Sequence, residues 1–307
     1  MKFLKLIAVL FLMWSLTSCE KTINMNITQG SKDIVVEGVI ETNQQPYVTL
    51  SNSIGFFDKI DLNSIQYIKN ADVHVYDLTS GKSVKLKEYT IDTTIGENHF
   101  SFSVYGPDIN DPDAMSFVGI EEHFYRMTIQ TDSKFCEAYT KIPKAIALDS
   151  IWLEPIPGKE TEFKSFKGLY IDPDTFGNCL KYQTLNHKRI KTGEVEMYYD
   201  PFTLAYDDAI INGTSFPITF DLGYDKTQNY EGEELFNQAY VRPGDTVTLK
   251  CQAIDRNSYK FWSGLNISQN SVGNPFATPL KIQGNVSNAL GAFCGYGVSY
   301  FTLIDSL

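Results

Sequence analysis

The sequence predicts a mainly β protein with two β-sandwich domains, the first immunoglobulin-like and the second larger, with one short helix at about residues 255–270. Short runs rich in Val, Ile, Thr, Tyr and Phe follow one another along the chain, and several alternate apolar with polar residues. Turn-forming residues separate these runs. This pattern is typical of strands that bury one face against a second sheet.

Residues 33–145 contain seven such runs, the number of strands expected for an immunoglobulin-like sandwich. The connections "TSGK" and "TDSK" are short enough to form hairpin turns. The predicted strands are 33–40, 46–52, 72–78, 83–90, 99–104, 123–131 and 135–142.

A proline-rich stretch at 142–158 indicates a domain boundary near residue 145, because proline interrupts strand pairing. In the segment 255–270, apolar residues recur at roughly helical spacing behind Asp255, which suits a helix N-cap, so we expect a short helix packed on a sheet. The strands expected in the second domain, residues 146–307, are 146–155, 165–172, 179–188, 194–200, 215–222, 245–254 and 295–304.

The N-terminus predicts a lipoprotein signal peptide over residues 1–18. Lys2 and Lys5 precede an apolar run of 11 residues, which is far shorter than the roughly 20 needed to span a bilayer as a helix. The following "LTSC" resembles a bacterial lipobox, in which Cys19 is acylated and becomes the first residue of the mature protein. The alternative is an ordinary secretory signal with a chance cysteine. The polar residues 19–32 are expected to form a tether.

Net charge and cysteine spacing argue against two kinds of binding site, for nucleic acids and for zinc. Removal of the signal with its two lysines leaves 24 basic against 37 acidic residues, a net charge of −13, which disfavours nucleic-acid binding. Apart from Cys19, four cysteines remain without a zinc-site spacing: Cys136, Cys179, Cys251 and Cys294. An exported protein permits disulfides, but buried free thiols inside strands are an equal alternative.

The sequence offers no recognisable catalytic or cofactor-binding motif, and we expect neither an enzyme nor a cofactor. It has no GxSxG elbow, phosphate-binding loop or dinucleotide fingerprint, and its four histidines lack motif neighbours. Asp172, Asp174 and Asn178 resemble the start of a calcium loop, but the expected glutamate is replaced by Gln183. This is a weak metal candidate, and a solvated turn is the ordinary explanation. The acidic loop 108–113 is a second weak metal candidate, and a solvated turn is its ordinary explanation too.

Two connections in the first domain, 54–71 and 105–123, are long for a sandwich, and long loops in compact folds often carry function. Their aromatic and apolar side chains suit a contact with a partner protein if they are exposed. Folded inward, they cap the core, and the cap is the favoured alternative. These candidate contact residues are Phe56, Phe57, Tyr67, Met115 and Phe117.

A series of segments follows the lipobox in a characteristic order, beginning with "CEK" and "IVVEGVIETNQQPYVTLSNSIGFFD" and continuing through "NADVHVYD", "ALDSIWLE" and "DDAIINGTSFPITFDL". The series extends to "RPGDTVTLKCQAIDRNSYKFWSGL" and the C-terminal "GNPFATPLKIQGNVSNALGAFCGYGVSYFTL". In this order the segments resemble a family of Bacteroidota outer-membrane lipoproteins known as domain of unknown function 4249. The resemblance covers essentially the whole mature chain. It implies a surface lipoprotein working with a TonB-dependent receptor, because members are commonly encoded beside such receptors. It implies no catalytic residues.

We therefore expect a non-enzymatic accessory lipoprotein anchored in the outer membrane, facing outward, that helps an outer-membrane β-barrel receptor capture or admit a substrate. One alternative is a stand-alone module that binds glycans or peptides, for which an exposed row of aromatic residues would speak. Another is a structural subunit of an outer-membrane assembly or secretion complex.

Overall fold

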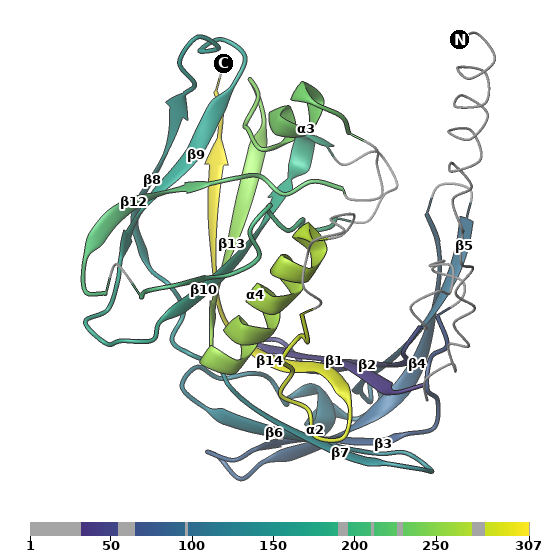
Figure 1. The fold of residues 1–307 in the computed structure, drawn as a ribbon. Coiled ribbons are helices and arrows are strands. Elements are labelled where there is room, and N and C mark those ends of the chain that lie inside the picture. The colour runs from purple at the N-terminus through teal and green to yellow at the C-terminus, as the bar shows by residue number, and fades with distance from the viewer. Residues whose placement is uncertain are drawn as a thin grey trace, which may run out of the picture. The chain divides into compact units, whose positions relative to one another are not determined.

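The structure is a computed structural model that describes residues 32–54, 65–95, 98–189, 196–209, 212–225, 230–271 and 280–306. The predictions for the signal peptide, Cys19, the tether before Lys32, Phe56 and Phe57 lie outside these residues. The described chain is mainly β, as the sequence predicts: an 11-stranded mixed sheet, a three-stranded sheet and a few short helices (Figure 1).

All seven strands predicted before residue 145 are present. The turns between them use the expected chemistry: Asp77 accepts from the amide nitrogens of Thr79 and Ser80, and Gly81 takes a positive φ of 76°. The strands are β1 (Ile34–Glu41), β2 (Tyr47–Asn52), β3 (Asp72–Asp77), β4 (Ser83–Ile95), β5 (Asn98–Pro107), β6 (Phe124–Gln130) and β7 (Phe135–Lys141), with the unpredicted helix α2 (Pro112–Met115) between β5 and β6.

The later part of the chain adds seven strands and the expected helix. α4 (Arg256–Asn270) begins behind Asp255, whose side chain accepts from the amide nitrogen of Ser258 at 2.7 Å. The strand predicted at 194–200 is wrong for residues 196–200, where only Tyr199 forms a bridge, to Thr184. The other elements are β8 (Leu148–Pro155), β9 (Lys164–Ile171), β10 (Cys179–Asn186), η2 (His187–Arg189), β11 (Tyr206–Asp207), β12 (Ser215–Phe220), α3 (Glu233–Gln238), β13 (Thr246–Ile254) and β14 (Leu290–Ile304).

Strand β14 joins the two parts of the chain into one sheet. It pairs in parallel with β1, from Val35 opposite Leu290 to Glu41 opposite Tyr296, and antiparallel with β13. The strand order is β11-β10-β13-β14-β1-β2-β5-β4-β3-β6-β7. Gly297 permits this arrangement, because a Cβ there would lie 2.2 Å from the carbonyl oxygen of Pro143. The hydrogen-bonded sheet therefore continues across the predicted boundary at residue 145.

Two of the three hydrophobic clusters in the described chain draw mainly on one side of residue 145, and the third joins Val39 to Cys179 and Ile254. The first draws on residues from Ile34 to Ile142 together with Val286 and Phe293. The second draws on residues from Ile146 to Ala253. Strand β14 contributes residues to both of these cores, Phe293 to the first and Phe301 and Leu303 to the second. A domain boundary near residue 145 therefore stays a prediction.

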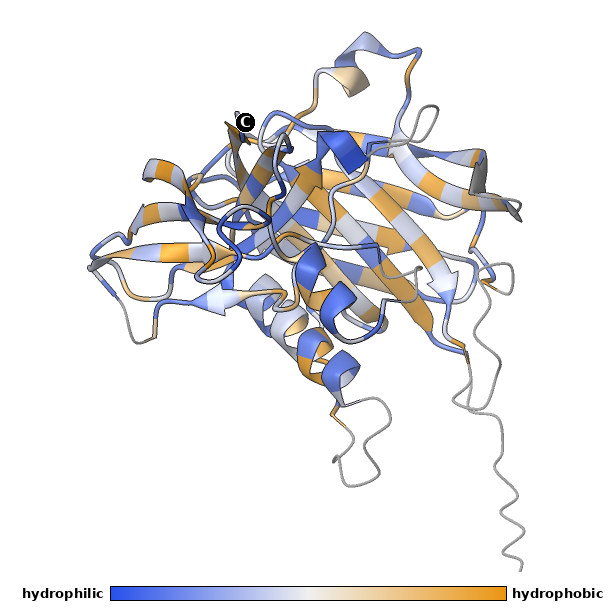
Figure 2. Ribbon diagram, turned by 90° about the horizontal axis from the view of Figure 1, so that it is seen from above, coloured by the Kyte–Doolittle hydropathy of each residue, from blue (hydrophilic) through white to orange (hydrophobic). Residues whose placement is uncertain are grey.

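Strands β10, β13 and β14 are covered on both faces. One face packs on the sheet β12-β9-β8, where Tyr182 contacts Phe220 with ring centroids 4.9 Å apart. The other packs on α4, whose Tyr259 and Trp262 join a cluster with Cys294 and Tyr296. Figure 2 shows orange and paler residues interspersed with blue along the large sheet. Burial on both faces explains why β13 is almost continuously buried and does not alternate.

The edge strand β7 is capped by side chains instead of another strand. Asn285 and Asn288 donate from their amides to the carbonyl oxygens of Tyr139 and Phe135. Ser287 accepts from the amide nitrogen of Glu137 at 2.9 Å. These contacts satisfy an edge that would otherwise be open to pairing with another chain. Among the described helices, none has the length and apolar character needed to cross a membrane.

Candidate functional site

The candidate site lies on one side of the large sheet, which we call the inner face. In β13 and β14 this side faces α4. In β1 and β2 the same side points away from the first core. Strand alternation and register place the side chains. Val36 and Ile40 point into the first core, so Glu37 and Glu41 point to the inner face. Tyr47, which pairs with Val39, joins them there.

A buried ion pair joins β1 to β13 across β14. Lys250 Nζ lies 2.8 Å from both carboxylate oxygens of Glu41, and the two side chains are only 12% and 11% exposed. Tyr198 covers the ammonium, with its ring centroid 5.7 Å from Nζ, and packs beside Tyr300 at 6.2 Å. The pair is therefore held in one geometry, and its charges are compensated.

A second cation on this face is equally well satisfied. The side chain of Lys181 is 2% exposed, pairs with Asp200 and lies over the ring of Trp262, 4.5 Å from its centroid. Trp262 in turn donates from Nε1 to the hydroxyl of Tyr296 at 3.0 Å. These contacts dock α4 on the sheet through a charged group and two aromatic rings.

Glu37 differs from these groups. Its side chain is exposed, and within the described residues it makes no ion pair or hydrogen bond. The pKa of its carboxyl is nevertheless raised, first by desolvation from the surrounding protein and then by the charge of Asp200. Glu37 is therefore an exposed carboxylate without a counter-charge among the described residues, and its ionised form is disfavoured.

Tyrosines surround Glu37. Tyr47 is 43% exposed, and its pKa is raised by desolvation and by the nearby Glu41 and Glu37 carboxylates. The pKa of Tyr67 is raised in the same way, by desolvation and then by Glu37. Tyr67 bridges to Ser51 of β2 and packs edge-on against Phe102 of β5 at 6.3 Å. Aromatic side chains thus extend the inner face from β1 to β5.

We predict that Glu37→Gln stabilises the protein at neutral and alkaline pH. A carboxyl whose folded pKa is raised holds its proton more tightly in the folded state, so its ionised form opposes folding. The gain in melting temperature should be absent near pH 4, grow as pH rises through the folded pKa, and then level off. Melting curves of both proteins between pH 4 and 9 measure this; a constant difference across that range would contradict it.

The opposite side of strands β3, β6 and β7 also exposes aromatic residues, but its cations already cover some of the rings. Arg126 lies over Tyr76 at 5.5 Å and pairs with Glu137, and Lys141 lies over Phe124 at 5.5 Å. Tyr139 remains half exposed. Because these ring faces are occupied, this outer face offers less to a ligand than the inner one.

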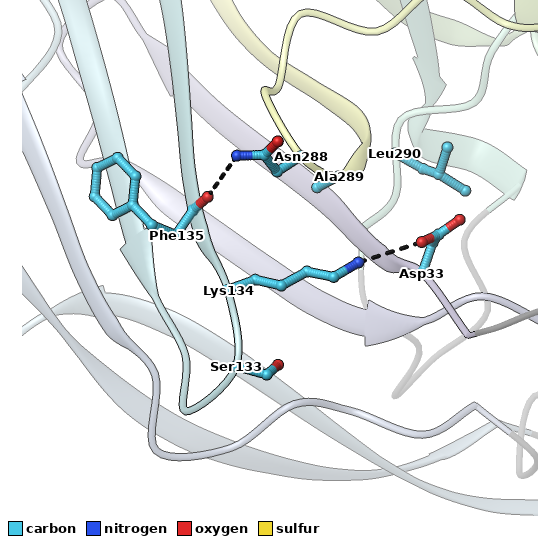
Figure 3. A pocket seen from close by; sticks show the side chains of 7 residues that line it. All are labelled: Asp33, Ser133, Lys134, Phe135, Asn288, Ala289 and Leu290. Atoms are coloured by element: carbon cyan, nitrogen blue, oxygen red, sulfur yellow. Dashed lines mark hydrogen bonds and ion pairs between the residues drawn. The ribbon is translucent and has the colours of Figure 1, made fainter.

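A polar pocket of about 580 Å³ lies where the described chain begins (Figure 3). Lys134 reaches across it to Asp33 at 3.3 Å, while the ring of Phe135 points away from this ion pair. Its charges are paired with each other and both are half exposed. The residues that line it are Asp33, Ser133, Lys134, Phe135, Asn288, Ala289 and Leu290.

The predicted contact residues fall in different places. Tyr67 lies at the inner face, as described above. Phe117 is 7% exposed and packs edge-on against Tyr125 at 6.4 Å, which is the cap over the core that the sequence left as the alternative. Met115, at the end of α2, is 36% exposed. The structure does not bring these three residues to one surface.

The weak metal candidate is occupied by local hydrogen bonds. The buried carboxylate of Asp172 accepts from the Tyr170 hydroxyl at 2.9 Å and the Gly213 amide nitrogen at 3.0 Å. Asn178 donates from its side chain to the carbonyl oxygen of Thr175, and Asp174 is exposed. Among the described residues, no three His, Cys, Asp or Glu side chains are arranged to hold a metal ion.

One histidine and the four cysteines of the described chain have defined surroundings. His123 Nδ1 lies 2.8 Å from a carboxylate oxygen of Asp77, and the Ser80 hydroxyl donates to the same oxygen. The four cysteines are buried free thiols, as one of the two alternatives predicts, and burial raises the pKa of each: Cys136, Cys179, Cys251 and Cys294.

The residues that sequence reasoning missed are Glu37, Glu41, Tyr47, Lys181 and Lys250. For the four charged residues among them, the signal is a charge inside an apolar strand, as in "VVEGVIE", "CLKYQTL" and "VTLKCQAI", whereas Tyr47 carries no such signal. Such a charge normally marks the solvent side of a strand, so only the topology reveals that these groups meet.

The sequence profile of a family described as Domain of unknown function (DUF4249) matches residues 20–301. No curated protein matches the chain.

Proposed function

Because the chain belongs to the DUF4249 family over residues 20–301, we propose that it is a lipid-anchored, non-enzymatic binding protein of the bacterial outer membrane. It faces outward and helps a TonB-dependent receptor capture or admit a substrate. The observation that carries the binding role is the inner face, where an exposed carboxylate and exposed tyrosines sit beside ion pairs that are internally satisfied.

The anchor in this proposal is Cys19. "LTSC" suits acylation and cleavage at this cysteine, and several acyl chains on one residue hold a protein far more firmly than the marginal grip of a single chain. The polar tether then gives the fold a mobile attachment. The Bacteroidota origin rests on the resemblance in the sequence.

The proposal includes a finer view of the fold. In it, residues 33–145 are an immunoglobulin-like sandwich and residues 146–307 a larger second sandwich, and β14 is shared between them. The division of the two cores near residue 145 supports this view. The inner face then spans both units, since Glu41 and Lys250 come from either side of the boundary.

We predict that Cys19→Ala moves most of the protein from the membrane to the soluble fraction. Removing the acylated thiol removes the acyl chains, each methylene of which contributes roughly 0.8 kcal/mol to membrane binding. Fractionation with metabolic labelling by a radioactive fatty acid measures both effects. Cys136→Ala is the matched control and should keep label and membrane association. Undiminished labelling of Cys19→Ala would rule out the anchor.

The partner is tested by purifying the native protein from its own membranes in mild detergent, followed by mass spectrometry. The proposal expects a TonB-dependent receptor to be recovered in a near-equimolar amount. Recovery of the protein alone, under conditions in which other barrel complexes survive, would count against the partnership. Recovery with an assembly or secretion complex would favour the structural-subunit alternative.

A stand-alone glycan-binding module is the second candidate, favoured by the half-exposed Tyr139 and Phe124 on the outer face. Sugar rings stack on exposed aromatic faces, but Lys141 covers Phe124, which leaves Tyr139 as the main platform. A glycan array with the purified protein and Tyr139→Ala tests it. Binding that disappears in the variant would promote this candidate over the first.

A further inference from the structure

The charges on the inner face do not balance. Three ion pairs lie on this face: Lys250 with Glu41, Lys181 with Asp200 and Arg256 with Asp207. Glu37 has no cation among the described residues. The charged group that raises the pKa of its carboxyl is another carboxylate, Asp200. Within the described part of the chain, one negative charge on this face therefore lacks a counter-charge.

Two tyrosines on this face also lack a cation among the described residues. The chain places its own cations over several half-buried rings, as Arg126 does over Tyr76 and Lys250 over Tyr198. Within the described residues, no cation lies over Tyr47 or Tyr67, the two tyrosines beside Glu37. Both an anion and two ring systems are thus left open at one place.

The backbone register makes this place a built surface. Val39 pairs with Tyr47 and Glu37 with Thr49, so the Tyr47 ring lies diagonally across from the Glu37 carboxylate on the same face. Such diagonal neighbours are within reach of long and aromatic side chains. β1 and β2 hold both groups in the centre of the sheet, between β14 and β5. Strand pairing on both sides therefore fixes the backbone that carries Glu37 and Tyr47.

We propose that Glu37, Tyr47 and Tyr67 bind a cationic group of the ligand, an ammonium or guanidinium such as a lysine or arginine side chain of a peptide carries. The carboxylate supplies a charge-assisted hydrogen bond and the tyrosine faces supply cation–π contacts. Desolvation of Glu37 strengthens the first interaction, because a desolvated charge is less screened by water. The inference rests on the proposed binding function, for which it names the chemical class of substrate.

The test uses the full mature chain in detergent and three short peptides with acetylated N-termini and amidated C-termini: tri-arginine, tri-lysine and tri-citrulline. With its ends blocked, tri-citrulline is a neutral analogue of tri-arginine. Calorimetric titration should show binding of one or both cationic peptides and at least about tenfold weaker binding of tri-citrulline. Tighter binding of tri-arginine than of tri-lysine would indicate that the site prefers a guanidinium, and the reverse order would indicate that it prefers an ammonium. Equal binding of all three peptides would overturn the inference.

A matched variant separates the site from the general attraction of an acidic protein for cations. Glu37→Gln should weaken the cationic peptide about tenfold, and Tyr47→Ala several-fold. Glu154→Gln removes the same charge from an exposed pair with Lys167, and should change affinity less than twofold. Equal weakening by Glu37→Gln and Glu154→Gln would show unspecific attraction only. Melting curves establish that each variant is folded.

The outcomes for this site and for the proposed function are separable. If the receptor co-purifies with the Glu37→Gln protein but peptide binding never depends on Glu37, the cation site is wrong and the partnership stands. If the peptides bind as expected but no receptor is recovered, the site stands and the partnership is wrong.

Discussion

Replacing Glu41 with alanine is expected to lower the free energy of unfolding by about 3–5 kcal/mol, because it leaves the ammonium of Lys250 buried without its counter-charge. Both side chains are almost fully covered, and Lys250 Nζ contacts both carboxylate oxygens at 2.8 Å. The Tyr198 ring over the ammonium cannot replace the lost charge, since a cation–π contact contributes only about 0.5–2 kcal/mol.

Chemical denaturation of Glu41→Ala and of the parent protein measures this loss. Glu154→Ala, in an exposed pair with Lys167, is the control and should cost less than about 1 kcal/mol. The double variant Glu41→Leu, Lys250→Met should recover most of the stability, because it removes both buried charges and fills their volume. If Glu41→Ala and Glu154→Ala were equally mild, the pair would not be buried in solution.

The same pair explains how the sheet holds two cores together. Glu41 belongs to β1 and Lys250 to β13, with β14 between them. This contact resists sliding of β1 relative to β13. A register shift by one residue would turn Lys250 into the second core, where no carboxylate could meet it.

The strands were predictable because their signal is local. Alternation in β3 and β7, the turn chemistry at Gly81 and the cap at Asp255 each involve only a few neighbouring residues. The parallel pairing of β1 with β14 was not predictable, because it joins residues about 250 positions apart and leaves no periodic trace in either strand. The predicted strand at 194–200 failed for the opposite reason: its "VEMYY" has strand propensity, but the described residues there run along the edge of β10 with a single bridge.

The candidate site was less predictable than the fold. Loop length led to Tyr67, which lies at the inner face, but also to Phe117, which is buried under the end of the first core. Long loops attract attention because they carry function in many proteins, whereas Glu37 lies in the middle of a strand. Whether a described cation reaches Glu37 depends on all the elements around it, so only the assembled sheet shows that none does among the residues the structure describes.

Replacing Asp255 with alanine is expected to cost about 2–4 kcal/mol, because one carboxylate serves two elements. Its Oδ1 accepts from the amide nitrogen of Ser258 at 2.7 Å and caps α4, a contact that contributes about 0.5–2 kcal/mol. Its Oδ2 accepts from the Thr140 hydroxyl at 2.8 Å and from the Lys141 amide nitrogen at 3.0 Å, both in β7. Loss of these leaves a partly buried backbone donor without a partner, which costs about 1–3 kcal/mol.

Asp255→Ser separates the two roles. Serine is as good an N-cap as aspartate, so the helix end is preserved, but its short side chain cannot also reach β7. We expect Asp255→Ser to recover roughly the capping share of the loss, and hydrogen exchange at the Lys141 amide to be faster than in the parent in both variants. The docking of α4 would then depend on its contact with β7 as well as on its own N-cap. This contact would couple α4, which lies over the inner face, to β7 at the edge of the first core. Full recovery of stability and of Lys141 protection by serine would show that the link to β7 contributes nothing, and α4 would be held by Trp262 and its neighbours alone.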